Sequence, residues 1–160
     1  MIEEEELTGR IISAFYKVYN TLGYGFIERI YHNSMIIELV TQGLAIETEE
    51  AINVHYDGNL VGSFSADLIV ENKIILELKA KETIQDAHIA QLTNYLRSTN
   101  IEIGMVLNFG RRPEFKRKYF PNSNKGASDN NSKSLLGTLF PQDPFHPPHP
   151  FYPLSKLPVN

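Results

Sequence analysis

The chain has 160 residues, no cysteine and a formal net charge of -4. That length suffices for one domain with its own hydrophobic core, and the lack of cysteine excludes disulfides and thiolate metal sites. The N-terminal sequence MIEEEE lacks the basic and then apolar pattern of a secretory signal, and no apolar run approaches the roughly 20 residues that span a bilayer. We therefore expect a cytoplasmic protein without a membrane segment.

Two amphipathic helices are predicted near the N-terminus. The first carries apolar residues at helical spacing and ends at Gly23, a natural C-terminal stop; its stripe is Leu7, Ile11, Phe15, Val18 and Leu22. The second follows a short GYG turn and ends at Gly43. Its predicted stripe is Ile27, Ile30, Ser34, Ile37 and Val40.

Three or four antiparallel strands are expected next, in the stretches LAIET, AINVHY, LVGSFSADLIV and KIILELKA. Residues 84–98 return to helical character, with Ala87, Ala90 and Leu96 available for packing. The stretch IEIGMVLNF reads as a last buried strand. The predicted order is two helices, an antiparallel meander, a helix and a strand.

Beyond Phe120 the composition changes to a polar stretch and then to a proline-rich one. Together these two stretches contain eight of the nine prolines. Such a segment cannot supply regular main-chain hydrogen bonds along its length. We expect a domain over residues 1–120 and a flexible tail over 121–160. The tail could bind a protein partner that has an aromatic-lined groove, the alternative being an extended terminus with no such role.

Three charged residues, Asp67, Glu77 and Lys79, interrupt two strands that otherwise look buried. A three-residue loop over 71–73 would pair Leu68 with Leu76 and place Asp67 opposite Glu77, with Lys79 on the same side. A two-residue loop would instead place Asp67 opposite Leu76. The position of the charges therefore depends on this register.

Two carboxylates held close together repel each other and raise each other's pKa, and a divalent cation that prefers oxygen ligands relieves the repulsion. Mg²⁺ or Mn²⁺ would suit Asp67 and Glu77. Lys79 would orient a water molecule or neutralise developing charge. The alternative is that Glu77 and Lys79 form a solvated pair at a strand edge and that Asp67 begins a bend.

Polar and aromatic residues on two predicted helices form further candidates. Glu28 and Tyr31 lie three residues apart on one side of the second helix, although a first-turn glutamate also stabilises a helix by itself. His88, Gln91 and Tyr95 form one stripe on the third helix, which could equally face solvent.

Basic residues concentrate in RRPEFKRKYF, where aromatic residues are interleaved with them. This pattern suits phosphates and unstacked bases, and a solvated domain edge explains it as well. The candidate nucleic-acid-binding residues are Arg111, Arg112, Lys116, Arg117 and Lys118.

Three motifs follow one another along the chain: Gly25, Glu28 and Tyr31 in GFIERIY, Asp67 with Glu77-Leu78-Lys79, and Gln91 with Tyr95 in HIAQLTNYL. In this order the chain resembles the GxxExxY protein family, which looks like a branch of the PD-(D/E)XK nuclease superfamily, over roughly residues 5–118. Ala66 occupies the place of the proline in the superfamily's name.

The resemblance implies an α/β, restriction-endonuclease-like core of order α-β-β-β-α-β, with a four-stranded mixed sheet flanked by helices and an extra N-terminal helix. It also implies that Asp67 and Glu77 bind Mg²⁺ or Mn²⁺ and that Lys79 assists the hydrolytic water. Gln91 would orient groups at the site and Glu28 would complete the acidic cluster, with Tyr31, His88 and Tyr95 in support.

The function we expect is a metal-dependent nuclease that hydrolyses phosphodiester bonds of DNA or RNA. One alternative is a catalytically inactive nucleic-acid- or protein-binding module of the same fold. Another is a dimeric interaction protein whose tail recruits a partner.

Overall fold

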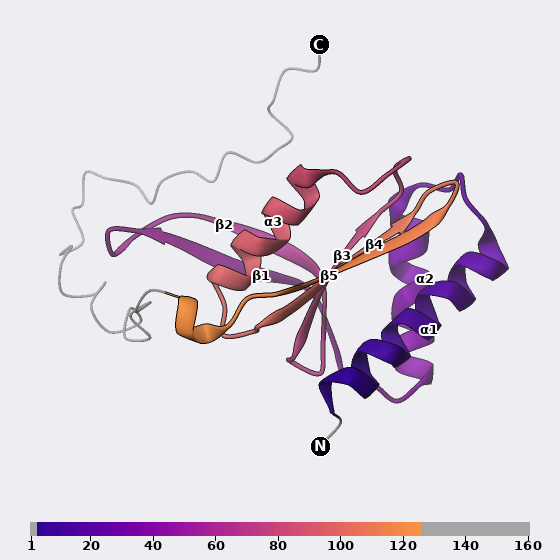
Figure 1. Ribbon diagram of the computed structural model, residues 1–160, viewed down its shortest axis with the longest axis horizontal. Helices are drawn as coiled ribbons and strands as arrows, with labels where there is room; N and C mark the ends of the chain where they lie inside the picture. The colour runs from indigo at the N-terminus through magenta and orange to yellow at the C-terminus, as the bar shows by residue number, and fades with distance from the viewer. Residues whose placement is uncertain (1–2, 126–160) are drawn as a thin grey trace, which may run out of the picture. The chain divides into compact units, whose positions relative to one another are not determined.

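The structure is a computed structural model that describes residues 3–125, except for the side chains of residues 49 and 50. The helices and strands follow the predicted order and are followed by one strand more (Figure 1): α1 Glu4–Leu22, α2 Glu28–Thr41, β1 Ile46–Tyr56, β2 Asn59–Val70, β3 Ile74–Lys79, α3 Asp86–Arg97, β4 Ile103–Phe109, β5 Pro113–Tyr119 and the short 3₁₀ helix η1 Asn122–Asn124. Within the described range, no helix is long and apolar enough to cross a bilayer. Most of the predicted tail, residues 126–160, lies outside the described residues, so the boundary at 120 stays a prediction.

The strands form one mixed sheet in the order β1-β2-β3-β4-β5. Strand β3 runs parallel to β4, with α3 as the crossover between them, and every other neighbouring pair is antiparallel. The expected mixed sheet flanked by helices is confirmed. It has five strands rather than four, because residues 113–119 pair along the free edge of β4.

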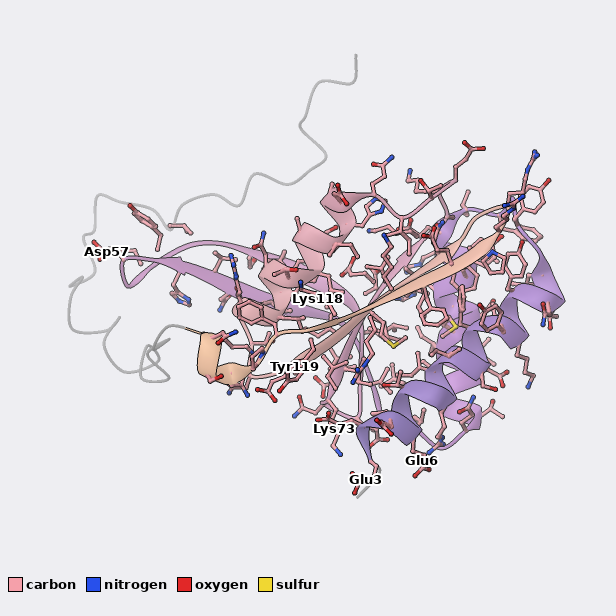
Figure 2. All side chains as sticks on the ribbon, in the orientation of Figure 1. Glu3, Glu6, Asp57, Lys73, Lys118 and Tyr119 are labelled. Carbon is pink, nitrogen blue, oxygen red and sulfur yellow. The ribbon has the colours of Figure 1, made fainter. Side chains whose placement is uncertain are left out.

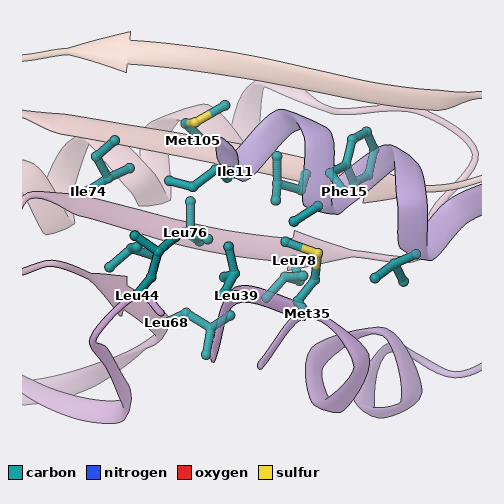
Figure 3. Packing of buried hydrophobic residues seen from close by; sticks show 14 of the residues in the cluster. Ile11, Phe15, Met35, Leu39, Leu44, Leu68, Ile74, Leu76, Leu78 and Met105 are labelled. Carbon is teal, nitrogen blue, oxygen red and sulfur yellow. The ribbon is translucent and has the colours of Figure 1, made fainter. Parts of the chain in front are cut away.

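Helices cover both faces of the sheet and enclose two hydrophobic cores. Helices α1 and α2 pack on one face, where Ile74, Leu76 and Leu78 of β3 point (Figure 3). Helix α3 packs on the other face, against Ile75 of β3 and Val106 of β4. Successive residues of β3 therefore serve opposite cores, as the two-residue period of a strand requires.

The first helix buries the predicted stripe, but the second helix does not. Helix α2 turns Tyr31, Met35 and Leu39 to the sheet, whereas Ile27 and Ile37 of the predicted stripe are 70% and 67% exposed. The helix carries apolar residues on two sides, and helical spacing alone cannot tell which side meets the sheet. The prediction was therefore right about the helix and wrong about its buried face.

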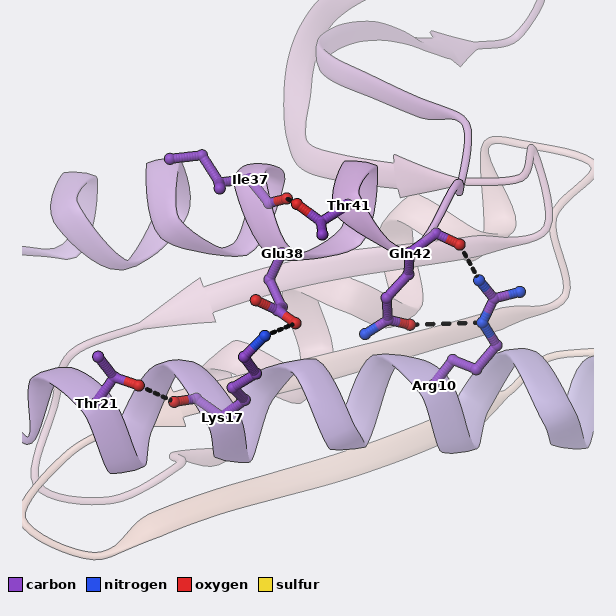
Figure 4. Close-up of polar contacts among 7 residues, drawn as sticks. All are labelled: Arg10, Lys17, Thr21, Ile37, Glu38, Thr41 and Gln42. Atoms are coloured by element: carbon purple, nitrogen blue, oxygen red, sulfur yellow. Dashed lines mark hydrogen bonds and ion pairs between the residues drawn. The ribbon is translucent and has the colours of Figure 1, made fainter.

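Polar contacts align α1 with α2 along their exposed sides (Figure 4). The Nζ atom of Lys17 lies 2.8 Å from Oε1 of Glu38, and the guanidinium of Arg10 donates to the side-chain and main-chain oxygens of Gln42. Exposed ion pairs of this kind contribute about 0–1 kcal/mol each. The apolar contacts beneath them therefore supply most of the stabilisation, and the polar contacts fix the alignment of the two helices.

One further detail of the prediction is decided by the structure and one is corrected. Residues from both LAIET and AINVHY form the single strand β1, so the meander has three strands, one of the two numbers expected. Helix α3 buries Leu92, Tyr95 and Leu96, while Ala87 and Ala90 face solvent. The larger side chains of this helix fill the space above the sheet, and the small alanines take the outer side.

Gly110 tests how tightly the end of β4 packs against the segment that follows β3. A Cβ atom at this position would lie 2.1 Å from the main-chain oxygen of Lys81, which cannot move without displacing the backbone. We expect Gly110→Ala to lower the free energy of unfolding by about 1–3 kcal/mol, the usual cost of overpacking. Gly62→Ala is the matched control, since nothing lies within 4 Å of its Cβ. Urea denaturation of both variants would contradict the expected packing if Gly110→Ala were as stable as the control.

Candidate active site

Strands β2 and β3 separate at the candidate active site. Their pairing runs from Val70–Ile74 to Leu68–Leu76, the register predicted for a three-residue turn, and ends there. Asp67 is consequently not paired with Glu77 through the main chain. Its Oδ2 atom instead accepts a hydrogen bond of 2.7 Å from the Leu78 amide. A side-chain carboxylate thus replaces a strand carbonyl at the point where the two strands separate.

Glu77 places a buried carboxylate beside this point. The residue is only 2% exposed, and its Oε2 atom lies 3.4 Å from the Nζ atom of Lys79. Its Oε1 atom is buried and has no hydrogen-bond partner among the described residues. Burial, and then the nearby charge of Asp67, raises the pKa of Glu77 to about 8, although Lys79 acts in the opposite direction. The site therefore favours a proton or a cation at Glu77.

Both carboxylates act on the same residue of α3. Burial comes first among the causes that raise the pKa of Tyr95 to about 12, and the charges of Glu77 and Asp67 add to it. The Tyr95 ring stacks on Phe64 with 3.9 Å between centroids, and its hydroxyl accepts a hydrogen bond from the side-chain Nε2 of Gln91. The structure thus brings the predicted pair Gln91 and Tyr95 together, within electrostatic range of the carboxylates.

His88 lies in the first turn of α3 and takes part in its N-terminal capping box. Its Nδ1 atom accepts a hydrogen bond of 3.1 Å from the Gln85 amide. Burial, and then the positive charges of Lys79 and Lys81, lowers the pKa of His88, while Glu28 acts in the opposite direction. The end of β3 and the start of α2 therefore both lie within electrostatic range of the start of α3.

A cavity of about 200 Å³ lies between α2 and the separated strands, and it is lined by Glu28, Arg29, His32, Asp67 and Leu78. The Nε2 atom of His32 lies 3.1 Å from the main-chain oxygen of Asp67, which holds α2 against β2. His32 was not predicted as a site residue. The sequence feature that could have identified His32 is its position four residues after Glu28, on the same face of the helix.

Glu28 shares this cavity with Asp67. Within residues 3–125, no group of three or more His, Cys, Asp or Glu side chains that could hold a metal ion is found. That Glu28 completes an acidic cluster with Asp67 and Glu77 stays a prediction.

Tyr31 belongs to the core and not to the cavity. Its ring stacks on Phe109 with 4.4 Å between centroids, and its hydroxyl donates to the Gly23 oxygen at 2.8 Å. The same hydroxyl accepts a hydrogen bond from the Phe26 amide, and Gly25 between them has a φ of +107°, which side-chain-bearing residues rarely adopt. Tyr31 therefore holds the turn before α2 and so sets the position of Glu28.

Asn108 is a second residue that the sequence did not single out. It is fully buried near the end of β4, where its side chain accepts a hydrogen bond from the Lys81 amide and donates one to the Lys81 oxygen, both at 2.9 Å. These bonds hold the segment that directly follows Lys79. The available signal was one polar residue inside an otherwise apolar strand.

The five basic candidates do not form one patch. Lys116 and Lys118 lie on the α3 face of β5, in register with Val106 and Gly104 of β4. Val106 of β4 pairs with Lys116 of β5 and also with Glu77 of β3, so Lys116 and Glu77 lie in one line across the sheet and on the same face. Arg117 faces the opposite side with Tyr119, and Lys118 and Tyr119 lie on opposite sides of the strand in Figure 2. Arg111 and Arg112 belong to the turn between β4 and β5.

Comparison with known proteins gave a family match and several distant structural likenesses, of which two are described. The family model of the PD-(D/E)XK nuclease superfamily matches residues 5–118. The crystal structure of SSO0001 has a TM-score of 0.48 and 23% identity, and the match covers 74% of this chain and 60% of that one. An alkaline exonuclease from Laribacter hongkongensis, LHK-Exo, has a TM-score of 0.45 and 8% identity, with 77% and 74% covered. None of the curated proteins matches significantly.

The raised pKa of Glu77 predicts how stability depends on pH when divalent ions are removed with EDTA. The folded state holds this proton up to a pKa of about 8, against an ordinary value of 4.5. Below pH 4.5 Glu77 is protonated in both states and its charge does not affect stability. As the pH rises from 4.5 to about 8, the free energy of unfolding falls, because the unfolded state loses this proton first. Glu77→Gln removes the charge. We expect the difference in free energy of unfolding, variant minus unmodified protein, to increase by on the order of 2–4 kcal/mol from pH 5 to pH 9.

Urea denaturation at both pH values measures this difference, and Glu82→Gln at an exposed position serves as the control. The burial of the Glu77 carboxylate would be contradicted if both variants followed the unmodified protein in parallel across the pH range.

Proposed function

The chain belongs to the PD-(D/E)XK nuclease superfamily, and from this we propose that it is a metal-dependent nuclease that hydrolyses phosphodiester bonds of DNA or RNA. Nucleases of this superfamily generally use divalent metal ions. The observation that carries the proposal is the buried Oε1 atom of Glu77, which lacks a partner among the described residues and lies within electrostatic range of Asp67.

The donor atoms at this position suit an oxygen-preferring cation. Asp67 and Glu77 would hold Mg²⁺ or Mn²⁺, and binding would relieve both their mutual repulsion and the cost of burying Glu77. When bound, the ion would supply positive charge against the phosphate and would favour deprotonation of the attacking water. With two side-chain ligands, the remaining positions would be left to the main chain, water and the phosphate.

The residues around the carboxylates divide the other tasks. Lys79 keeps its ammonium near Glu77 with its side chain only 14% exposed, so its charge can orient the water and offset charge that develops on the phosphate. Gln91 acts as a positioning residue by holding the Tyr95 hydroxyl. Glu28 forms the polar wall of the cavity beside Asp67, and His88 and Tyr31 support the starts of the two helices.

Cleavage assays test the proposed role of Asp67, Glu77 and Lys79. We expect Asp67→Asn, Glu77→Gln and Lys79→Met each to lower the cleavage rate by on the order of 100-fold or more with Mg²⁺ or Mn²⁺. The first two variants lose a carboxylate that would hold the ion, and the third loses a positive charge beside the phosphate. The substrates are single- and double-stranded DNA and RNA, and Glu47→Gln, at an exposed position of β1, is the control. Equal cleavage by all variants would assign the activity to a contaminating nuclease and remove the proposal.

The two faces of β5 predict which basic residues contact phosphates. Lys116 and Lys118 share the face of Glu77, and Arg111 and Arg112 lie at the adjoining turn, so we propose that these four bind nucleic acid and that Arg117 contributes less. Replacing Lys116 and Lys118 together by Gln should reduce the slope of log affinity against log salt concentration by about 1.4–1.8. Fluorescence anisotropy measures this slope. Arg117→Gln is the control, and an equal loss in it would contradict the assignment of faces.

A binding module without turnover is the second candidate function. It is favoured by the finding that residues 3–125 contain no group of three possible metal-ligating side chains. Binding that survives both EDTA and Asp67→Asn, with no cleavage of any substrate, would support this alternative. Self-association and a cytoplasmic location remain predictions, and capture of a partner by the tail falls mostly on residues outside the described range.

A further inference from the structure

A second cavity, of about 240 Å³, lies next to the candidate active site. Its lining includes three aromatic residues, Tyr24, Phe26 and Phe109, together with the basic Lys81 and Arg111 and the acidic Glu82. Of these residues, Arg111 alone was singled out from the sequence. The cavity therefore combines flat apolar surfaces with two positive charges and one negative charge.

This cavity shares its chain segments with the site of the proposed reaction. Ala80 and Lys81 directly follow Lys79, and Phe26 lies two residues before Glu28. Two residues of extended chain span at most about 7 Å. A ligand in the cavity would therefore lie close to a phosphate held at Glu77 and Lys79.

Two of the three aromatic side chains of the cavity, those of Tyr24 and Phe26, are open to solvent, whereas Phe109 is buried. Tyr24 is 54% exposed and Phe26 is 46% exposed, although burying either ring would be favourable. The guanidinium of Arg111 lies 5.7 Å from the centre of the Tyr24 ring, within range of a cation–π interaction. Tyr24 and Arg111 thus form one aromatic and cationic wall.

Hydrogen bonds and packing hold the walls in place without a ligand. The Tyr19 hydroxyl donates to the main-chain oxygen of Arg111 at 2.8 Å, and Asn108 binds both main-chain polar groups of Lys81. The Phe26 ring meets Tyr31 edge-on at 6.2 Å. Because these groups are already positioned, a ligand would bind without first ordering them.

We propose that this cavity binds one unpaired nucleobase of the strand whose phosphodiester lies at Glu77 and Lys79. Exposed aromatic rings stack on bases, and a neighbouring arginine strengthens the contact. A base inside a duplex has both faces covered and cannot enter, so the substrate is single-stranded or carries an extruded nucleotide. The inference rests on the proposed function, since it uses that site to place the phosphate.

The test measures binding in EDTA, so that it does not depend on turnover. Fluorescein-labelled single-stranded DNA, single-stranded RNA and blunt duplex DNA of equal length are titrated with the full chain and followed by anisotropy. We expect Tyr24→Leu to weaken single-strand binding by about tenfold, the loss of one stacked base, and to change duplex binding less than twofold. Tyr24→Phe keeps the ring and should bind as the unmodified protein does.

Tyr56→Leu is the matched control, since Tyr56 is a 74% exposed tyrosine at the end of β1, outside the residues that line the cavity. Phe26→Leu provides a second variant if Tyr24→Leu fails to fold, and it should cause a loss in the same direction. The arm that shows the tenfold loss identifies DNA, RNA or both as the source of the base.

The inference is overturned if neither single-stranded arm changes, if duplex binding weakens equally, or if Tyr56→Leu has the same effect. These outcomes are separate from failure of the proposed function, which the cleavage assays detect. A protein that cleaves normally but binds equally well with Tyr24→Leu would keep the nuclease proposal and lose the base cavity.

Discussion

The hydrogen bond from the Leu78 amide to the Asp67 carboxylate occupies the place where β2 leaves β3, and much of the site is arranged around it. Pairing of the two strands ends one residue earlier, so a cavity can open between them without leaving this amide unsatisfied. The main-chain oxygen of Asp67 is in turn held by His32 of α2. Asp67 thus accepts the hydrogen bond of a β3 amide, anchors α2 through His32 and places a negative charge beside Glu77.

That placement has an energetic consequence for the fold. A carboxylate at Glu77 is nearly excluded from water, has one buried oxygen without a partner among the described residues, and feels the charge of Asp67. Lys79 offsets only part of this cost, because the pKa of Glu77 remains raised. Polar arrangements that disfavour the folded state are typical of functional sites. The unfavourable burial of the Glu77 carboxylate, which lowers the stability of the fold, would be relieved by a bound cation and would therefore favour its binding.

The residues around the site divide into those that face it and those that hold it. In the GFIERIY motif, Gly25 allows the turn and Tyr31 fixes it, so that Glu28 enters the cavity at the start of α2. On the other side, Asn108 fixes the chain after Lys79. The same residues support the second cavity, because Gly25 lines it, Tyr31 contacts Phe26 and Asn108 binds Lys81. The candidate active site and the proposed base cavity therefore share their supports.

The structure has the three-residue turn between β2 and β3, one of two registers that the sequence left open. Local periodicity determined much of the rest from the sequence alone: the buried stripe of α1 from Leu7 to Val18, and the order of the helices and strands from α1 to β4. These features depend on residues close together in the chain. Only the tertiary structure decided which side of α2 is buried, that residues 113–119 form an edge strand dividing the basic residues between two faces, and that His32 and Asn108 hold the site. A periodic pattern indicates that a helix or strand has an apolar face but not which segment packs against it. That depends on contacts between segments far apart in the sequence.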